Sequence, residues 1–298
     1  MISILIPTYN YTVFSLVENL QKQCESANVV YEILVFDDAS TDKKSLEENS
    51  KINSLAHCSF QVLDKNIGRS KIRNLLAEKA TYTWLLFLDA DTFPSSSKFI
   101  SNYVAAFSEE SSVVFGGIEY PKNTSENVRL RYKYGSERES LTLSERIKNP
   151  YHSFITMGFG IKKDVFKTIK FNEKLTGYGY EDSVFGYELQ KNNISLLHID
   201  NPVIHLNLET NEDFIYKSHL ALQNLLNFYN EGSIDGENVK ILKTYLKLKK
   251  WNLLFAARAI FAVFKNPLLK NLTSSKPSLF LFDLYRLGYL SSLKAKDA

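Results

Sequence analysis

Two aspartates separated by one residue follow an apolar run in the first third of the sequence. The run is Trp84–Leu88, and Asp89-Ala90-Asp91 comes directly after it. Where a strand frays at its end, two such carboxylates can converge on one ion. Carboxylate oxygens suit Mg²⁺ or Mn²⁺, which bridge to substrate phosphates. The alternative for an isolated Asp-x-Asp is an acidic turn after a buried strand.

A second acidic pair, Asp37-Asp38, closes the predicted strand Tyr31–Phe36. A carboxylate at this position can accept a hydrogen bond from a nucleobase N–H. Pro7-Thr8-Tyr9, at the end of the first predicted strand, offers backbone groups and an aromatic face to the same base. The alternative is that Asp38 and the hydroxyl residues after it cap the next helix. These residues alone favour the two interpretations equally.

A third candidate segment, Asn66-Ile67-Gly68-Arg69, joins a predicted strand to a predicted helix that carries Arg73. Gly68 permits a close approach of the backbone to a ligand, and guanidinium groups suit phosphate. The alternative is that both arginines are solvated surface residues, which is the commoner situation.

An acidic pair also follows the glycine-rich segment Gly177-Tyr178-Gly179-Tyr180. The two glycines predict a mobile loop that delivers Glu181 and Asp182 to the start of the helix 182–191. The helix dipole favours ionised carboxylates there, and a carboxylate held in this way can act as a general base. The alternative is an ordinary capping pair.

His205 follows the short apolar run Pro202-Val203-Ile204. A lone histidine after a strand is more often a packed or surface residue than a ligand. A neutral imidazole could, however, complete a metal site with the Asp89/Asp91 pair.

The elements that must position these residues alternate between short β-branched runs and helical patterns over the first 120 residues. Five runs predict strands: Ile2–Ile6, Tyr31–Phe36, Phe60–Leu63, Trp84–Leu88 and Val113–Ile118. This alternation indicates a largely parallel sheet with helices on both faces, and such sheets bind ligands at the carboxyl ends of their strands. Residues 121–150 are polar and predict a flexible excursion. Beyond about residue 211 the pattern is helical.

Composition excludes several classes of protein. The chain has 298 residues, of which 44% are hydrophobic and 23% are charged, so it can bury a core and is neither disordered nor fibrous. Two cysteines are too few for a disulfide scaffold or a thiolate zinc site and favour a reducing compartment. The N-terminus lacks the features of a secretory signal. The longest apolar stretch, Trp251–Phe264, is too short to span a bilayer.

The motifs above, in their order along the chain, resemble those of the family 2 glycosyltransferases, which have the GT-A fold. The resemblance runs from Ile2 to about Leu206 and also includes Gly158-Phe159-Gly160-Ile161 and Phe171-Asn172-Glu173. The segment before Glu181-Asp182 is similar to one in chondroitin-polymerase-type and galactosyltransferase-like members. Asn172 and Tyr178 depart from the aspartate and tryptophan common at these positions, and neither change removes a catalytic group.

The resemblance implies a nucleotide-diphospho-sugar transferase fold: a mostly parallel sheet flanked by helices, with a C-terminal helical extension. It also implies an inverting, metal-dependent transfer of sugar from a nucleotide-sugar donor, with UDP favoured, to a saccharide or lipid-linked saccharide in cell-surface polysaccharide synthesis. Asp182 would be the base, and Glu181 would orient the acceptor. Asp89, Asp91 and His205 would hold Mn²⁺ or Mg²⁺. Asp38 would bind the nucleobase within a larger donor set comprising Pro7, Thr8, Tyr9, Asp38, Asn66, Arg69, Arg73, Asp89 and Ala90.

Other functions explain fewer of the residues. A sugar nucleotidyltransferase should carry a glycine-rich basic loop after its first strand, where this chain has Pro7-Thr8-Tyr9. A non-catalytic saccharide-binding module would be expected to lack Asp91 or Asp182. A haloacid-dehalogenase phosphatase needs its threonine one place later than Thr92. Nucleic acid is not an expected partner, because the basic residues of the tail alternate with aliphatic ones.

The near-neutral formal charge of +3 conceals an uneven distribution. Residues 239–298 contain twelve Lys and Arg and two Asp, a net charge of +10. Residues 1–238 therefore carry a net charge of −7. We therefore expect a catalytic domain at 1–210 and a basic helical extension at 211–298. The extension fits an anionic membrane interface, or equally a helix packed on the catalytic domain with solvated lysines. The expected location is cytoplasmic, peripheral on the inner face of the membrane.

Overall fold

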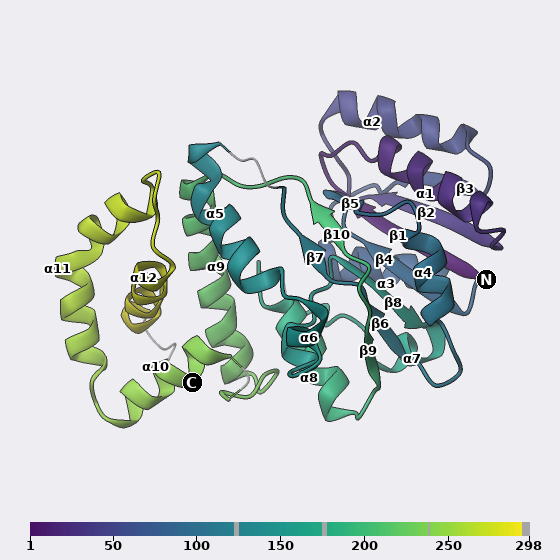
Figure 1. The fold of residues 1–298 in the computed structure, drawn as a ribbon. Coiled ribbons are helices and arrows are strands. Elements are labelled where there is room, and N and C mark those ends of the chain that lie inside the picture. The colour runs from purple at the N-terminus through teal and green to yellow at the C-terminus, as the bar shows by residue number, and fades with distance from the viewer. Residues whose placement is uncertain (122–124, 175–177, 238, 294–298) are drawn as a thin grey trace. The chain divides into compact units, whose positions relative to one another are not determined.

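The structure is a computed structural model that describes residues 1–121, 125–174, 178–237 and 239–293. The chain forms two compact units (Figure 1). The first comprises residues 1–120, 140–176 and 188–207, and the second comprises 121–139, 177–187 and 208–298. The second unit thus takes in two segments from the first 210 residues. The expected boundary near residue 210 stays a prediction.

A seven-stranded, mostly parallel sheet forms the centre of the first unit. Among the strands that the structure describes in this sheet, only β8 runs antiparallel to its neighbours, β4 and β6. The strands in spatial order are β3 (Cys58–Val62), β2 (Tyr31–Asp37), β1 (Ile2–Thr8), β4 (Trp84–Leu88), β8 (Gly158–Lys162), β6 (Val113–Phe115) and β9 (Leu196–His198). A second, three-stranded sheet has the order β5 (Thr92–Pro94), β10 (Val203–His205) and β7 (Ile118–Glu119).

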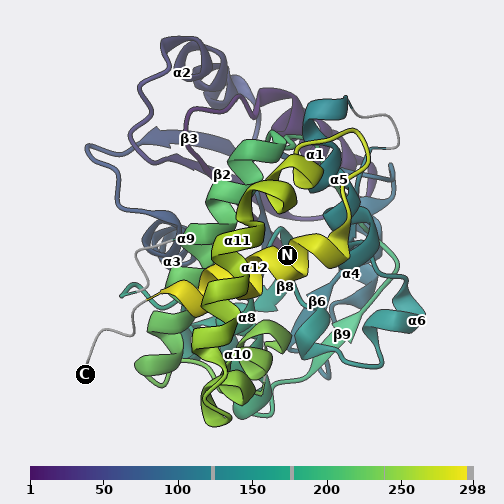
Figure 2. The ribbon, with the colours of Figure 1, turned by 90° about the vertical axis from the view of Figure 1, so that its left-hand side faces the viewer.

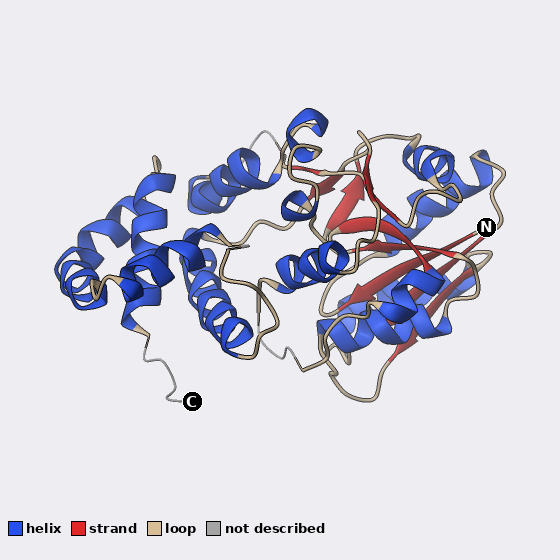
Figure 3. Ribbon diagram, turned by 90° about the horizontal axis from the view of Figure 1, so that it is seen from below, coloured by secondary structure: helices blue, strands red, loops and turns tan. Residues whose placement is uncertain are grey.

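Helices cover both faces of the large sheet (Figure 3). Those of the first unit are α1 (Phe14–Ser26), α2 (Lys43–Ser50), η1 (Lys51–Ser54), α3 (Arg69–Lys79), α4 (Phe99–Ala106), α6 (Leu143–Arg146), η4 (Tyr151–Ser153) and α7 (Lys163–Thr168). Alternate residues of β4 point to opposite faces. Leu86 and Leu88 pack with α1 and α4, whereas Phe87 stacks against Phe159 and contacts Phe166 of α7. The predicted α/β class is confirmed.

The predicted strand 113–118 is interrupted by two glycines and becomes two strands in different sheets. A Cβ on Gly116 would lie 2.1 Å from the carbonyl oxygen of Asn201, and Gly117 has a φ of +101°. Backbone contact at the first position and left-handed backbone at the second both favour glycine. The chain therefore leaves β6 at this point and enters β7 of the second sheet.

Helices dominate the second unit. They are η2 (Glu126–Val128), α5 (Arg129–Tyr134), the π-helical turn η3 (Gly135–Glu139), the start of α8 (Glu181–Lys191), α9 (Asn211–Asn230), α10 (Lys240–Lys250), α11 (Leu254–Leu272) and α12 (Leu279–Ser292). Helix α11 packs across α12 (Figure 2), where Gly288 leaves room for the ring of Phe261. The helical extension expected after residue 211 is thus present.

The expectation of a flexible excursion at residues 121–150 is wrong for its described part, which is largely helical. Two of its arginines are buried, because each meets several acceptors. Arg131 pairs with Glu139 and Glu209. Arg146, only 2% exposed, donates hydrogen bonds to the carbonyl oxygens of Phe115, Gly116 and Ile199. The polar composition of the segment serves buried ion pairs and backbone contacts.

Arg146 also contacts the buried imidazole of His198. The guanidinium lies 3.3 Å from Nδ1 of the imidazole, and Nε2 lies 3.1 Å from the carbonyl oxygen of Pro150. A neutral ring satisfies both contacts, accepting at Nδ1 and donating at Nε2. Burial and the charge of Arg146 lower the pKa of His198 to about 4.

We predict that this histidine makes the folded state sensitive to acid. The unfolded chain takes up its proton near the ordinary pKa of about 6.5, whereas the folded chain resists protonation down to about 4. Stability is therefore present above the higher value and is lost as the pH falls between the two. From pH 7 to pH 4.5 the loss should be about 2 kcal/mol. Urea unfolding of the wild type and His198→Gln at both pH values measures it, and equal pH slopes would contradict the assignment.

Candidate active site

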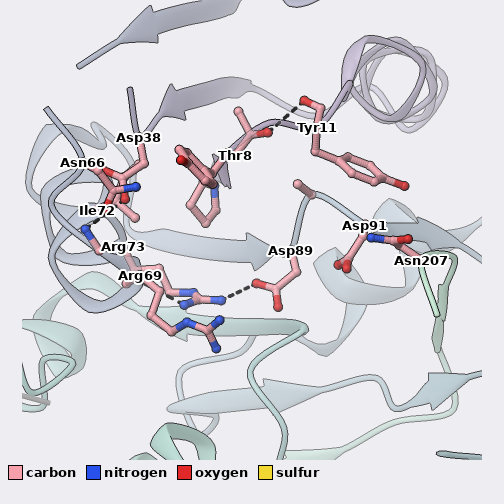
Figure 4. Close-up of a pocket in the computed structure, with 14 residues that line it drawn as sticks. Thr8, Tyr11, Asp38, Asn66, Arg69, Ile72, Arg73, Asp89, Asp91 and Asn207 are labelled. Carbon is pink, nitrogen blue, oxygen red and sulfur yellow. Dashed lines mark hydrogen bonds and ion pairs between the residues drawn. The ribbon is translucent and has the colours of Figure 1, made fainter. Parts of the chain in front are cut away.

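A cavity of about 410 Å³ lies in the first unit at the carboxyl ends of β1, β2 and β4 (Figure 4). Parallel strands present their carboxyl ends at one edge of a sheet, so residues distant in sequence meet there. Every residue of the predicted donor set lines this cavity. Its lining is Pro7, Thr8, Tyr9, Tyr11, Asp38, Asn66, Gly68, Arg69, Ile72, Arg73, Asp89, Ala90, Asp91 and Asn207.

Asp38 is buried at the end of β2 and orders the loop that precedes α3. Its two carboxylate oxygens accept hydrogen bonds from the backbone N–H groups of Ile67, at 2.7 Å, and Gly68, at 2.9 Å. The cap of α2 is Asp42 instead, so the capping alternative for Asp38 is wrong. Asp38 thus fixes one wall of the cavity, and its contact with a nucleobase stays a prediction.

Arg73 and Asp89 form an ion pair at the floor of the cavity. Arg73 projects from α3 and is only 5% exposed, and its guanidinium also lies 5.4 Å from the ring centre of Phe171. A buried guanidinium needs such a partner, because an unpaired buried charge is costly. Figure 4 shows Arg69 beside Arg73, on the same side of Asp89. Two guanidinium groups therefore stand next to the first carboxylate of the Asp-x-Asp pair.

The second carboxylate, Asp91, meets His205. Antiparallel pairing of β10 with β5 places His205 opposite Thr92, and the N–H of Leu206 donates to the carbonyl oxygen of Asp91. The Nε2 of His205 lies 3.2 Å from Oδ2 of Asp91. Of the three predicted metal ligands the structure thus joins Asp91 to His205 and pairs Asp89 with an arginine.

The side chains of Asp91 and His205 fit a divalent cation whose remaining ligands would come from the substrate and water. Across the described residues, no three His, Cys, Asp or Glu side chains gather as a metal site. One carboxylate and one imidazole are nevertheless ligands that Mn²⁺ accepts. Ions of this class commonly bind through one or two protein carboxylates, with substrate phosphates and water supplying the rest.

Glu181 and Asp182 lie in the first turn of α8, within the second unit. The backbone just before them is held by α9. Gly179 has a φ of +86°, and a Cβ there would lie 2.6 Å from the Cβ of Ala221. The carbonyl oxygen of Tyr178 accepts a 2.9 Å hydrogen bond from Asn224. The described half of the segment is therefore packed, and Gly177 lies outside the described residues.

Tyr180 adds a second anchor, to α12. It is a non-glycine residue with a φ of +65°, a strained conformation that its surroundings must stabilise. Its hydroxyl accepts a 2.7 Å hydrogen bond from Arg286, and burial raises its pKa. The position of the acidic pair in the second unit thus depends on side chains from α9 and α12.

Three residues that line the cavity were not predicted: Tyr11, Ile72 and Asn207. Burial raises the pKa of Tyr11, and the negative charge of Asp91 adds to this effect. Its position directly after Pro7–Asn10 was the available signal. Asn207 reaches the cavity because β10 leads into it, and the sequence carries no comparable signal for that residue.

Comparisons with known proteins identify the family and the fold of the chain. The sequence model described as Glycosyl transferase family 2 matches residues 3–170. A Bacillus subtilis (strain 168) protein named for teichuronic acid biosynthesis, the glycosyltransferase TuaG, is 24% identical over 211 residues, which are 65% of this chain and 81% of that protein.

Two solved structures share the fold. The mannosyltransferase PcManGT of Pyrobaculum calidifontis, in complex with GDP-Man and Mn²⁺, is 15% identical and aligns with a TM-score of 0.61 over 97% of this chain and 85% of its own. S. aureus TarS 1–349, in complex with UDP-GlcNAc, is 21% identical and aligns with a TM-score of 0.51 over 96% and 89%.

The resemblance inferred from the motifs is confirmed, as is the GT-A fold. The family match covers more than half of the chain and includes β1, β2 and β4, whose ends form the cavity. This chain belongs to glycosyl transferase family 2 and is a glycosyltransferase.

Proposed function

We propose that the enzyme transfers a sugar from a nucleoside-diphosphate donor to a hydroxyl of a saccharide or lipid-linked saccharide, with inversion at the anomeric carbon. A divalent cation takes part, and UDP is the favoured nucleotide. The proposal depends on one observation: the two carboxylates of the Asp-x-Asp pair have different partners. Asp89 forms an ion pair with Arg73, and Asp91 contacts His205. The lining of the cavity therefore includes guanidinium groups and Asp91, and the buried imidazole of His205 lies behind that carboxylate. Groups of these two kinds are what a sugar diphosphate requires.

The relatives support the class of donor. PcManGT holds GDP-Man and TarS holds UDP-GlcNAc, so both neighbours in fold bind nucleotide sugars. TuaG is named for the synthesis of teichuronic acid, which supports a role for this chain in building a cell-wall or cell-surface polysaccharide. A panel of UDP- and GDP-sugars distinguishes between the two nucleotides.

Each cavity residue has a separate task in this proposal. Asp38 and the half-exposed ring of Tyr9 receive the base. Arg69 binds the diphosphate, while Arg73 holds Asp89 in place. Asp91 and His205 hold the cation, which when bound neutralises charge on the leaving diphosphate.

Asp182 is the general base of the proposed reaction. It takes the proton of the acceptor hydroxyl as that oxygen attacks the anomeric carbon. The bond from this carbon to the diphosphate oxygen breaks, and its electron pair leaves with the nucleoside diphosphate. Asp182 lies in the first turn of α8, where a helix dipole favours a negative charge. Glu181 beside it orients the acceptor.

We predict that His205→Gln raises the Mn²⁺ concentration for half-maximal transfer by about tenfold or more, because an imidazole ligand is lost. EDTA should abolish transfer by the wild type. Initial rates across a Mn²⁺ titration measure both effects, with the exposed His152→Gln as the matched control. Chelator-insensitive transfer would contradict the metal requirement.

Asp182→Asn should lower kcat by about 10²–10⁴-fold, since the amide cannot take the acceptor proton. Donor affinity should stay within twofold or so, because the base acts on the acceptor. Rates and donor titrations compare the variant with Glu231→Gln, an exposed residue of the same unit. Full activity in Asp182→Asn would remove it as the base.

Tyr180→Phe tests whether α12 positions the acidic pair. The change removes the acceptor of the Arg286 hydrogen bond and should lower kcat by about tenfold while leaving the donor KM unchanged. The measurement is kcat and KM together with the melting temperature. A lower melting temperature with unchanged kcat would show that the contact is only structural.

A further inference from the structure

Helix α11 presents an apolar face to solvent. Val263 lies near the middle of this face and is 71% exposed, Ile260 and Phe264 lie on one side of it, and Phe255, 81% exposed, lies on the other side in the first turn of the helix. Trp251, in the turn before α11, is also exposed. We call the four α11 residues the outer face of α11. Large apolar side chains that are exposed together on one helix are typical of an interaction site.

The opposite side of the same helix is already occupied. Phe261 and Leu272 are buried against α12, and the ring of Phe261 meets Tyr285 edge-on at 5.3 Å. The one charge in the first three turns, Arg258, donates from Nε to the carbonyl oxygen of Ser291 at the end of α12. The arginine is thereby drawn toward the packed side, and the outer face remains apolar.

A row of lysines on α10 leads into this face. Lys240, Lys243, Lys247 and Lys250 recur at helical spacing, and Lys249 stands beside them. Lys243 pairs with Glu237, whereas the other four are exposed. In residues 239–293 the only acidic residue is Asp283, which already pairs with Arg138. The region therefore combines apolar and cationic surface with little negative charge.

Within the described ranges no single helix is long and apolar enough to cross a membrane. Helices α10 and α11 meet that requirement only as a pair, and the chain bends by 119° between them. Trp251 lies at the bend, and tryptophan favours the boundary between water and lipid.

We propose that α10 and α11 dock the enzyme on an anionic lipid surface, with the outer face of α11 in the interface and the α10 lysines against the headgroups. Buried apolar area and attraction to anionic lipid both contribute to such binding. A second copy of the chain fits less well, because a two-fold contact would set lysines against lysines. The proposal does not rest on the identity of donor or acceptor. The cytoplasmic location expected from the sequence stays a prediction.

The apolar arm of the test uses the full chain and sedimentation with vesicles of phosphatidylcholine and phosphatidylglycerol at 7:3. Phe255→Gln/Val263→Gln should weaken partitioning by about tenfold or more, because two exposed apolar side chains no longer enter the interface. Both positions face solvent, so the melting temperature should not change. Val30→Gln/Ile147→Gln, at exposed apolar sites of the first unit, is the matched control and should bind like the wild type.

The charge arm compares these vesicles with phosphatidylcholine alone. Lys247→Gln/Lys250→Gln should weaken binding to the anionic vesicles by about tenfold, because each basic residue near the surface contributes to the attraction. Added salt should reduce wild-type binding in the same direction. Lys43→Gln/Lys44→Gln on α2 removes the same charge elsewhere and should have no effect.

Any of three results would overturn the proposal. The first is wild-type protein that stays in the supernatant with anionic vesicles. The second is a Phe255→Gln/Val263→Gln variant that binds them as tightly as the wild type. The third is a wild-type dimer by analytical ultracentrifugation that this variant converts to monomer, which would make the outer face of α11 an interface between copies.

Discussion

The spacing of one residue between Asp89 and Asp91, at the end of the central strand β4, constrains the whole cavity. The two carboxylates have different partners: Arg73 of α3 for the first and His205 of β10 for the second. Each partner arrives through regular structure. Helix α3 packs on β1 beside β4, and β10 pairs with the short strand β5 that follows Asp91. If either element shifted, one carboxylate would lose its partner, so the small second sheet is part of the site.

Much of this arrangement could be predicted from the sequence because strand ends are visible in it. The apolar runs that became β1, β2 and β4 end in polar clusters, and parallel pairing brings such clusters together. The entire predicted donor set lines one cavity for this reason. The partners could not be predicted. Whether Arg73 faces phosphate or Asp89 depends on the rotation of α3, and the approach of His205 to Asp91 joins residues 114 apart.

In the second unit, too, contacts between residues that are distant in sequence could not be predicted from the sequence. The glycine spacing before Glu181 predicted a mobile loop, yet Gly179 packs on Ala221 and Tyr180 bonds to Arg286. The positive φ angles of Gly179 and Tyr180, and the contact of Tyr180 with a residue 106 positions away, correspond to no local sequence pattern. The prediction of a flexible excursion at residues 121–150 was wrong for a related reason. Arg131 and Arg146 are polar, but their partners lie inside the protein. Composition cannot distinguish a solvated arginine from a buried, paired one.

We propose that the cavity of the first unit binds a nucleoside diphosphate together with a divalent cation held by Asp91 and His205. Isothermal titration of UDP into the full chain, with and without Mn²⁺, tests it most directly. We expect Mn²⁺ to tighten UDP binding by about tenfold or more in the wild type and to have little effect in Asp91→Asn. UDP affinity that is the same with and without Mn²⁺, or a Mn²⁺ effect that persists in Asp91→Asn, would contradict it.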